Sequence, residues 1–269
     1  MKRFIALLVA VMLLICTGAA AAEVLKCPNC GAEFNPELGY VYCPFCATPL
    51  VKEPAATAKD VKIGDIVTFG SYEQDNNLGN GPEPIEWIVL DVQDGKAFLL
   101  SKYGLDQGDY NDVRVEVTWE TCTLRKWLNG DFLNNAFNAE EINSILITSV
   151  DNSASQGYSK WSISGGNNTE DKVFLLSYAE ANRYLGLTRD DCSNIKARVA
   201  PTEHAILNGA GISDRYQTAE GLPAGWWWLR SPGSIELYVA DVYNDGSLYD
   251  DNVLSGSGTV RPALWVDLN

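Results

Sequence analysis

Histidine is scarce in this chain, where His204 is the single one among 269 residues. It lies in a short helical pattern, and no Ser or Cys accompanies it in a recognisable motif. Catalysis by a histidine-activated nucleophile is therefore disfavoured, and we expect His204 to pack or to lie at the surface. Carboxylates are plentiful, but no pair is distinguished as the acid and base of a glycosidase.

Basic residues are scarce as well. The chain has 20 Lys and Arg against 35 Asp and Glu, which gives a formal net charge of −15. Such a surface repels phosphate backbones, so we expect no nucleic-acid partner. We interpret the acidity itself mainly as an aid to solubility.

Long apolar runs are also few. The run from Phe4 to Ile15 follows two basic residues and is short for a helix that crosses a bilayer. Small residues with the cleavage-site pattern Ala20-Ala21-Ala22 follow, so residues 1–22 have the organisation of an export signal. We expect cleavage after Ala22 and no membrane span afterwards; a lipoprotein attached through Cys16 and an uncleaved anchor are the alternatives. Each places the rest of the chain outside the cytoplasm, secreted or associated with the cell surface.

Four of the seven cysteines form two Cys-x-x-Cys pairs separated by twelve residues, Cys27 with Cys30 and Cys43 with Cys46. This spacing brings four thiolates to the corners of a tetrahedron, the geometry of a closed structural Zn²⁺ site. Residues 23–50 are therefore predicted to form a zinc ribbon that needs its metal to fold. Disulfides in place of the metal, or a redox-active dithiol, are the alternatives.

Cys122 and Cys192 are the two cysteines outside the export signal and the predicted ribbon. Separation in sequence gives no distance in space, so one disulfide and two buried free thiols are equally compatible with the sequence.

A linker of small and charged residues at 51–62 leads into a domain at 63–269 that opens with β-structure. Alternating apolar residues predict strands at 63–69, 85–92 and 96–101, and Asp94-Gly95 predicts a hairpin turn between the last two. A further strand is predicted at 173–177.

Helices are predicted between and after these strands, at 121–133 and from Pro201 to Asn208. Two more follow the N-caps Asn138 and Ser177, because each has a Glu three residues later in the capping-box pattern. Long irregular segments are expected at 151–171 and 213–225, and loops of this length often carry function.

The C-terminal segment is predicted to begin and end with strands that form part of the structural framework of the domain. In a strand from Trp226 to Arg230, Trp226 and Trp228 share one face and Trp227 the other, and we interpret all three mainly as scaffold. Arg230 and Arg261 stand in apolar strands, so each is expected to bind a buried carboxylate or carbonyl groups.

The residues between these ends, 234–258, combine Tyr, Asp, Asn and Ser as antibody-like contact surfaces do. The candidate ligand-binding residues are Tyr238, Asp241, Tyr243, Asn244, Tyr249, Asp250 and Asn252. An ordinary polar hairpin is the alternative, as is a Ca²⁺ site, although the carboxylates lack EF-hand spacing. The binding hypothesis requires these side chains to gather on one exposed face.

Several motifs resemble the bacterial DUF6273 family: Phe69 to Tyr72, Pro84 to Leu90, Leu99 to Ser101, Leu124 to Leu128, Phe174 to Ser177, Trp227 to Gly233 and Val260 to Trp265. The resemblance covers about residues 60–269, and an N-terminal zinc ribbon is a common companion. It implies a C-type-lectin-like fold, distantly related to formylglycine-generating enzymes. It also implies that a diversity-generating retroelement is able to rewrite the C-terminal contact residues.

An enzyme of the formylglycine-generating type needs two reactive cysteines close together. Only Cys122 and Cys192 are available, and neither lies in the C-terminal region where that family would carry its pair.

Together these patterns predict an exported α+β protein. It has a signal peptide at 1–22, a structural zinc ribbon at 23–50, a linker at 51–62 and a C-type-lectin-like domain at 63–269, with a mixed antiparallel sheet and flanking helices. We expect it to bind a protein or glycan ligand without catalysis. An extracytoplasmic enzyme of formylglycine-generating-enzyme-like fold and a structural envelope protein are the alternatives.

Overall fold

The structure is a computed structural model that describes residues 25–26, 31–34 and 61–268. The chain divides into two units, Met1–Glu53 and Pro54–Asn269. In the first unit, β1 (Leu25–Lys26) pairs antiparallel with β2 (Glu33–Phe34). The predicted export signal and the four predicted zinc ligands lie outside the described residues.

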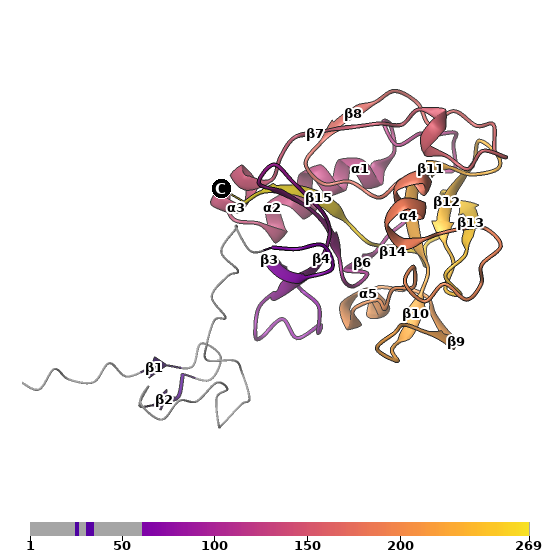
Figure 1. Cartoon of the computed structure of the whole chain (residues 1–269). Helices are drawn as coiled ribbons and strands as arrows, with labels where there is room; N and C mark the ends of the chain where they lie inside the picture. Colours follow the sequence, from indigo (N-terminus) through magenta and orange to yellow (C-terminus); the bar gives the residue numbers. More distant parts are fainter. Residues whose placement is uncertain (1–24, 27–30, 35–60, 269) are drawn as a thin grey trace, which may run out of the picture. The chain divides into compact units, whose positions relative to one another are not determined.

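A four-stranded antiparallel sheet with the order β15–β5–β4–β3 forms one half of the second unit (Figure 1). Its strands are β3 (Ile66–Tyr72), β4 (Glu83–Gln93), β5 (Lys96–Ser101) and β15 (Ala263–Asp267). Asp94 and Gly95 join β4 to β5 with φ angles of 49° and 74°. These left-handed conformations suit a type I′ hairpin turn, so the predicted hairpin is confirmed.

A five-stranded sheet with the order β13–β12–β11–β14–β6 forms the other half. Its strands are β6 (Asp106–Gln107), β11 (Trp227–Pro232), β12 (Tyr238–Val242), β13 (Leu248–Asn252) and β14 (Thr259–Val260). The pairing of β11 with β14 is parallel, and the other pairings are antiparallel. β15 begins three residues after β14 ends. These two consecutive strands connect the sheets, because β14 belongs to the five-stranded sheet and β15 to the four-stranded sheet.

Two short antiparallel pairs complete the β-structure of the described residues: β7 (Thr148–Val150) with β8 (Thr169–Asp171), and β9 (Ile212–Gln217) with β10 (Pro223–Gly225). The segment 213–225, predicted to be irregular, is therefore largely a hairpin. The predicted strand at 173–177 is wrong: only Phe174 bridges to Ala263, through hydrogen bonds of 2.9 and 2.7 Å. These residues are apolar because they are buried, not because they continue a ladder.

The α-helices lie where sequence patterns predict them, and one 3₁₀ helix lies in the segment 151–171 that was predicted to be irregular. A continuous helical segment consists of α1 (Thr123–Trp127), the π-helix η2 (Leu128–Phe132) and α2 (Leu133–Ala136). The others are α3 (Ala139–Ser144), the 3₁₀ helix η3 (Ala154–Gln156), α4 (Tyr178–Leu185) and α5 (Glu203–Leu207). Both predicted capping boxes are present, at the starts of α3 and α4. Gly186 ends α4 in the left-handed conformation.

The core contains the three consecutive tryptophans. Trp227 and Trp228 are fully buried and Trp226 is 8% exposed. Trp226 and Trp228 lie on one face with an edge-to-face ring contact of 4.7 Å, so their scaffold role is confirmed.

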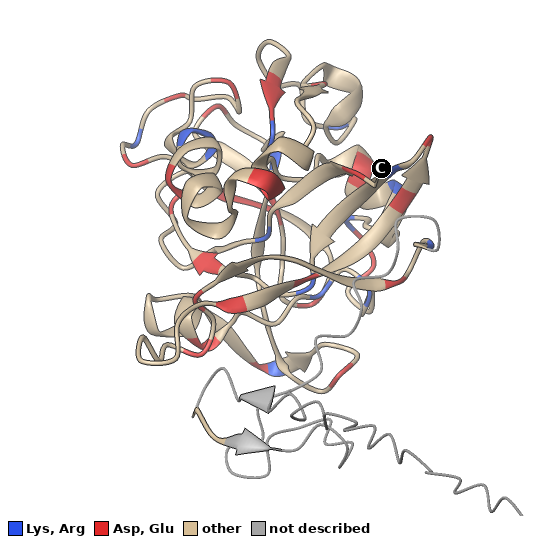
Figure 2. Cartoon of the chain, turned by 90° about the vertical axis from the view of Figure 1, so that its left-hand side faces the viewer, with Lys and Arg blue, Asp and Glu red and all other residues tan. Residues whose placement is uncertain are grey.

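The described part of the chain is a mixed α+β structure with mostly antiparallel sheets. None of its helices is long and apolar enough to cross a membrane. Asp and Glu residues are spread over strands, helices and loops rather than gathered on one patch of the face in view (Figure 2).

Candidate functional site

The predicted contact residues lie on the β12–β13 hairpin, at one edge of the five-stranded sheet. In this hairpin Asp241 is opposite Tyr249, and Tyr238 is opposite Asn252. Directly opposite side chains share a face, and alternate residues face opposite ways. Tyr238 and Asn252 therefore lie on the other face of the hairpin from Tyr249. The seven candidates do not share one face, so the requirement that they all gather on one exposed face is not met.

The exposed fractions of the side chains reduce the set of candidate ligand-binding residues further. Tyr249 and Tyr243 are 52% and 43% exposed, and their ring centroids are 5.6 Å apart. Tyr238, Asn244 and Asn252 are half-buried. Asp241 and Asp250, by contrast, are only 1% and 8% exposed. We therefore remove these two carboxylates from the candidate contact surface.

The two buried aspartates, Asp250 and Asp241, differ in their hydrogen bonds. Asp250 accepts hydrogen bonds from the backbone nitrogen and the hydroxyl of Ser234, which fixes the start of the polar segment. Neither oxygen of Asp241 has a hydrogen-bond partner among the described residues. Burial, followed by the carboxylates of Asp251 and Asp250, raises the pKa of Asp241 well above its usual range. The protonated form of Asp241 is thereby favoured.

The exposed tyrosines continue into a row of aromatic side chains that sequence patterns did not predict. The Arg189 guanidinium lies 5.9 Å from the Tyr249 ring centroid and 5.2 Å from that of Trp161. Tyr158 contacts Trp161 at 5.2 Å, and Tyr178 contacts Tyr158 at 5.5 Å, both edge to face. We call the following six residues the aromatic surface: Tyr158, Trp161, Tyr178, Arg189, Tyr243 and Tyr249.

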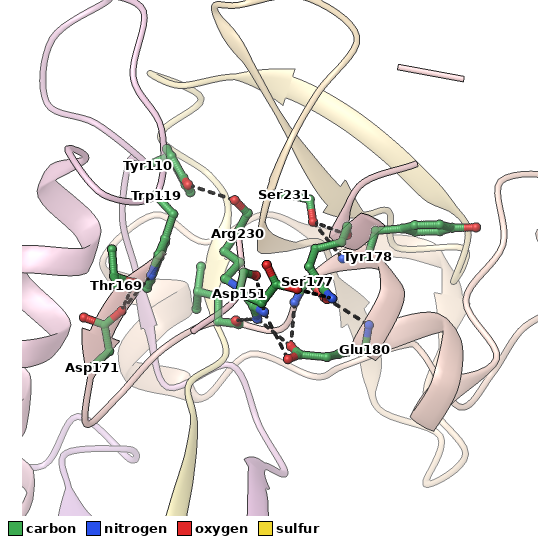
Figure 3. A network of polar contacts seen from close by, with 12 residues as sticks. Tyr110, Trp119, Asp151, Thr169, Asp171, Ser177, Tyr178, Glu180, Arg230 and Ser231 are labelled. Atoms are coloured by element: carbon green, nitrogen blue, oxygen red, sulfur yellow. Dashed lines mark hydrogen bonds and ion pairs between the residues drawn. The ribbon is translucent and has the colours of Figure 1, made fainter. Parts of the chain in front are cut away.

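Three separate segments position the aromatic surface. Leu248 of β13 donates a backbone hydrogen bond of 2.9 Å to Thr188, which places Arg189 beside the hairpin. Tyr178 is the first residue of α4, and its backbone nitrogen donates to the Ser231 hydroxyl at 2.9 Å. Its ring points away from the polar network behind it (Figure 3).

Arg230 is the centre of that network, and it binds as predicted for a framework residue (Figure 3). Its side chain is 2% exposed and donates to both carboxylate oxygens of Glu180, one of them at 3.0 Å. It also donates to the carbonyls of Leu175 at 2.7 Å and Asp151 at 3.1 Å. One guanidinium thus ties β11 to the start of α4 and to the loop that precedes Tyr158.

The far end of the 151–171 loop is held by Asp171, which is 2% exposed. It accepts hydrogen bonds from the Trp119 ring at 2.9 Å, from Thr169 at 2.6 Å and from Arg125 at 2.7 Å. The loop that carries Tyr158 and Trp161 is therefore fixed at both ends.

Arg261 differs from Arg230 because no carboxylate of the described residues reaches it. Its Nε donates to the Ser101 carbonyl at 3.0 Å, and its guanidinium lies 4.8 Å from the Trp227 ring centroid. Its Nη1 has no hydrogen-bond partner among the described residues. The expected tie to carbonyl groups is thus only partly made.

Cys122 and Cys192 are both free, so the disulfide alternative is wrong. Cys122 is buried as expected of an internal thiol, whereas Cys192 is exposed. Burial raises the pKa of Cys122 to about 12, and a hydrogen bond with Asp245 raises the pKa of Cys192. Since the thiolate is the nucleophile, neither cysteine is activated in this state.

One acidic group within the described residues brings three carboxylates together. Glu73, Asp75 and Glu83, around the β3–β4 connection, have oxygens within 4.8 Å of one another. The aspartates of the 234–258 segment form no such group, so the Ca²⁺ alternative for that segment has no converging carboxylates.

The mixed α+β domain contains no described pair of activated cysteines. Its aromatic surface joins the exposed Tyr243 and Tyr249 to four half-buried side chains. Residues 94–268 match the family described as Domain of unknown function (DUF6273). Because this match covers more than half of the chain, the protein belongs to the DUF6273 family. No curated protein and no solved structure matches the chain.

Proposed function

We propose that this protein is an exported, non-catalytic binding protein of C-type-lectin-like fold. Its ligand is a protein or a glycan, and the contact surface is the aromatic surface with the neighbouring Asn244. The observation that carries this proposal is the continuous row of ring and guanidinium–ring contacts from Tyr178 to Tyr243, made by residues from 158–161, 178, 189 and 243–249.

The chemistry of this row suits recognition. Tyr and Trp offer large rigid areas with a polar group at the edge, and together with Arg they are the residue types enriched at binding hot spots. Flat aromatic faces also pack well against the apolar faces of sugar rings.

The supporting structure keeps the surface ordered before a ligand arrives. Arg230 and Asp171 fix the two ends of the loop that carries Tyr158 and Trp161. A surface that is already in place loses less conformational entropy on binding, so rigid support favours affinity.

We propose three further properties that do not rest on the contacts described above: export, zinc binding and diversification by a retroelement. We propose that residues 1–22 direct export and that Cys27, Cys30, Cys43 and Cys46 hold one structural Zn²⁺. Retroelement diversification of the C-terminal segment is part of the same hypothesis. A neighbouring template copy and a reverse transcriptase gene would support it, and the absence of both from the neighbouring DNA would exclude it.

The enzyme alternative has weaker support. A formylglycine-generating type of site needs two cysteines that react together, whereas Cys122 is buried and Cys192 is exposed, with the pKa of each raised. No contact in the described residues favours the structural envelope role over binding.

A ligand screen tests the proposal. The mature chain is applied to a glycan array and to extracellular protein fractions, beside a Trp161→Ala variant and a Tyr216→Ala control. Tyr216 is a half-buried tyrosine on β9 outside the aromatic surface. We expect a saturable ligand that the wild type and the control retain and the Trp161 variant binds at least tenfold more weakly. A ligand bound equally by all three would contradict the proposed surface.

A further inference from the structure

A cavity of about 360 Å³ lies among several segments of the second unit. It is bounded by the first residues of β3, by β4, by the end of α4, by residues 195–200 and by the β9–β10 turn. None of the six residues of the aromatic surface lines it. Its size falls in the range of small-molecule sites.

Much of the cavity wall is apolar and open to solvent at its rim. Three isoleucines that line it are unusually exposed: Ile63 at 66%, Ile66 at 47% and Ile195 at 43%. Ile88 and Leu90 of β4 also line it. Exposed apolar side chains gathered around one hollow are typical of a binding site.

The charge of the lining is opposite to that of the whole chain. Four basic residues line the cavity, Lys102, Lys196, Arg198 and Arg261, against the single acidic Glu220. The full chain, by contrast, has a formal net charge of −15. A local excess of basic residues in an acidic protein favours an anionic ligand.

Two of the four basic side chains already have partners within the protein. Lys102 lies 3.1 Å from both Glu86 and Glu220, and Arg198 donates to three backbone carbonyls. The Lys196 ammonium is exposed and has no partner among the described residues. Lys196 and Arg261 are therefore the groups that have capacity for a ligand.

Arg261 is the more informative of the two because it is buried. It is 1% exposed, yet within the described part of the chain its Nη1 has no partner and no carboxylate lies against it. Burial lowers the pKa of this guanidinium to about 9. A buried cation without an anion is costly, and a ligand carboxylate would supply the missing partner.

We infer that this cavity binds a small carboxylate with an apolar body, such as a medium-chain aliphatic acid, with the carboxylate on Arg261 and the apolar body among the isoleucines. Nη1 is itself covered by protein, so the wall must open locally for the carboxylate to reach it. The site is separate from the aromatic surface and does not depend on the proposed function.

Calorimetric titration of the full-length protein with octanoate tests this inference, with neutral octanamide as the matched probe. We expect octanoate to bind at least tenfold more tightly than octanamide. Arg261→Lys keeps the charge but loses the planar donor pair, and should weaken octanoate binding at least tenfold with little effect on octanamide. Equal binding of the two probes, or no binding of octanoate, overturns the inference.

Two further variants decide the question if Arg261→Lys does not fold. Ala219 is exposed on the β9–β10 turn and lines the cavity, so Ala219→Trp should fill it and abolish octanoate binding. Lys196→Glu should weaken octanoate severalfold, whereas Lys126→Glu, an exposed lysine on α1, should not. Unchanged octanoate binding in both cavity variants contradicts the site.

Discussion

At the scale of single residues, two buried arginines in similar apolar strands have different surroundings. Arg230 has a bidentate carboxylate and two carbonyls, so its charge is matched where it is buried. Arg261 has one carbonyl and an aromatic face. Each has one buried donor without a partner among the described residues, Nε in Arg230 and Nη1 in Arg261. What differs is that Arg230 has a carboxylate and is a structural tie, whereas Arg261 has none among the described residues and lies beside a cavity. Sequence patterns alone place both in the same class.

Arg230→Ala should destabilise the domain by about 3 kcal/mol or more, because it leaves Glu180 and two carbonyls without their donor. Urea unfolding measures the loss. Arg183→Ala is the matched control, since that exposed arginine lies 3.7 Å from Asp91 with 68% of its side chain exposed. Its loss should cost less than about 1 kcal/mol. Similar losses in the two variants would show that the Arg230 network contributes little.

Asp241→Asn should change the pH dependence of stability. The folded pKa of Asp241 is raised, so in the wild type the folded state holds a proton that the unfolded state releases above pH about 4. Stability is therefore lost as pH rises from about 4 through the folded pKa, and Asn removes that loss. We expect the variant to be more stable than the wild type by at least about 1 kcal/mol at pH 7 and closer to it at pH 3. An equal difference at both pH values, measured by urea unfolding, would contradict this assignment.

At the scale of elements, sequence patterns predict the helix caps and the hairpin turn, but they do not predict which distant residues come together in the fold. Asn138, Ser177 and the Asp94-Gly95 turn act through neighbours in sequence, so their roles were predictable. The aromatic surface joins residues 158–161, 178, 189 and 243–249 through tertiary contacts that no local pattern encodes. Trp161 and Tyr158 in a polar loop were the one available signal. The buried segment 173–177 shows the opposite error, because burial alone produced an apolar run without a strand.

The β12–β13 turn gives a prediction at this scale. Gly246 has φ 88°, and a Cβ there would lie 2.1 Å from the Asn194 carbonyl oxygen. Gly246→Ala should therefore destabilise the domain by about 2 kcal/mol or more, from backbone strain and from this clash. Gly221 has φ 80° with nothing within 4 Å of the added atom, so Gly221→Ala should show the strain of about 1–2 kcal/mol alone. Thermal unfolding measures the loss of stability in the two variants. Equal losses would mean that the structure relieves the clash at Gly246 without a loss of stability.

At the scale of the whole molecule, the chain divides into two units, Met1–Glu53 and Pro54–Asn269. The second unit has a large apolar core that contains Trp87, Trp119, Trp227 and Trp228, all fully buried. For the first unit we propose that a metal ion supplies the stability that a small core cannot.

Zinc analysis tests the proposed role of the first unit. We expect one Zn²⁺ per chain by elemental analysis, and its loss in a Cys27→Ser/Cys46→Ser variant. Cys192→Ser, which changes an exposed free thiol, should keep the metal. Metal removal should leave the unfolding transition of the second unit in place. A full complement of zinc in the double variant would contradict the predicted ligands.

Recognition by the aromatic surface is tested most directly by the affinity of a Tyr243→Ala/Tyr249→Ala variant for a ligand from the screen. These two tyrosines are exposed and contact each other, so their removal should leave the core intact. We predict that the dissociation constant rises at least tenfold, about 1.4 kcal/mol, with unchanged thermal unfolding. A folded double variant that binds as tightly as the wild type would contradict the claim.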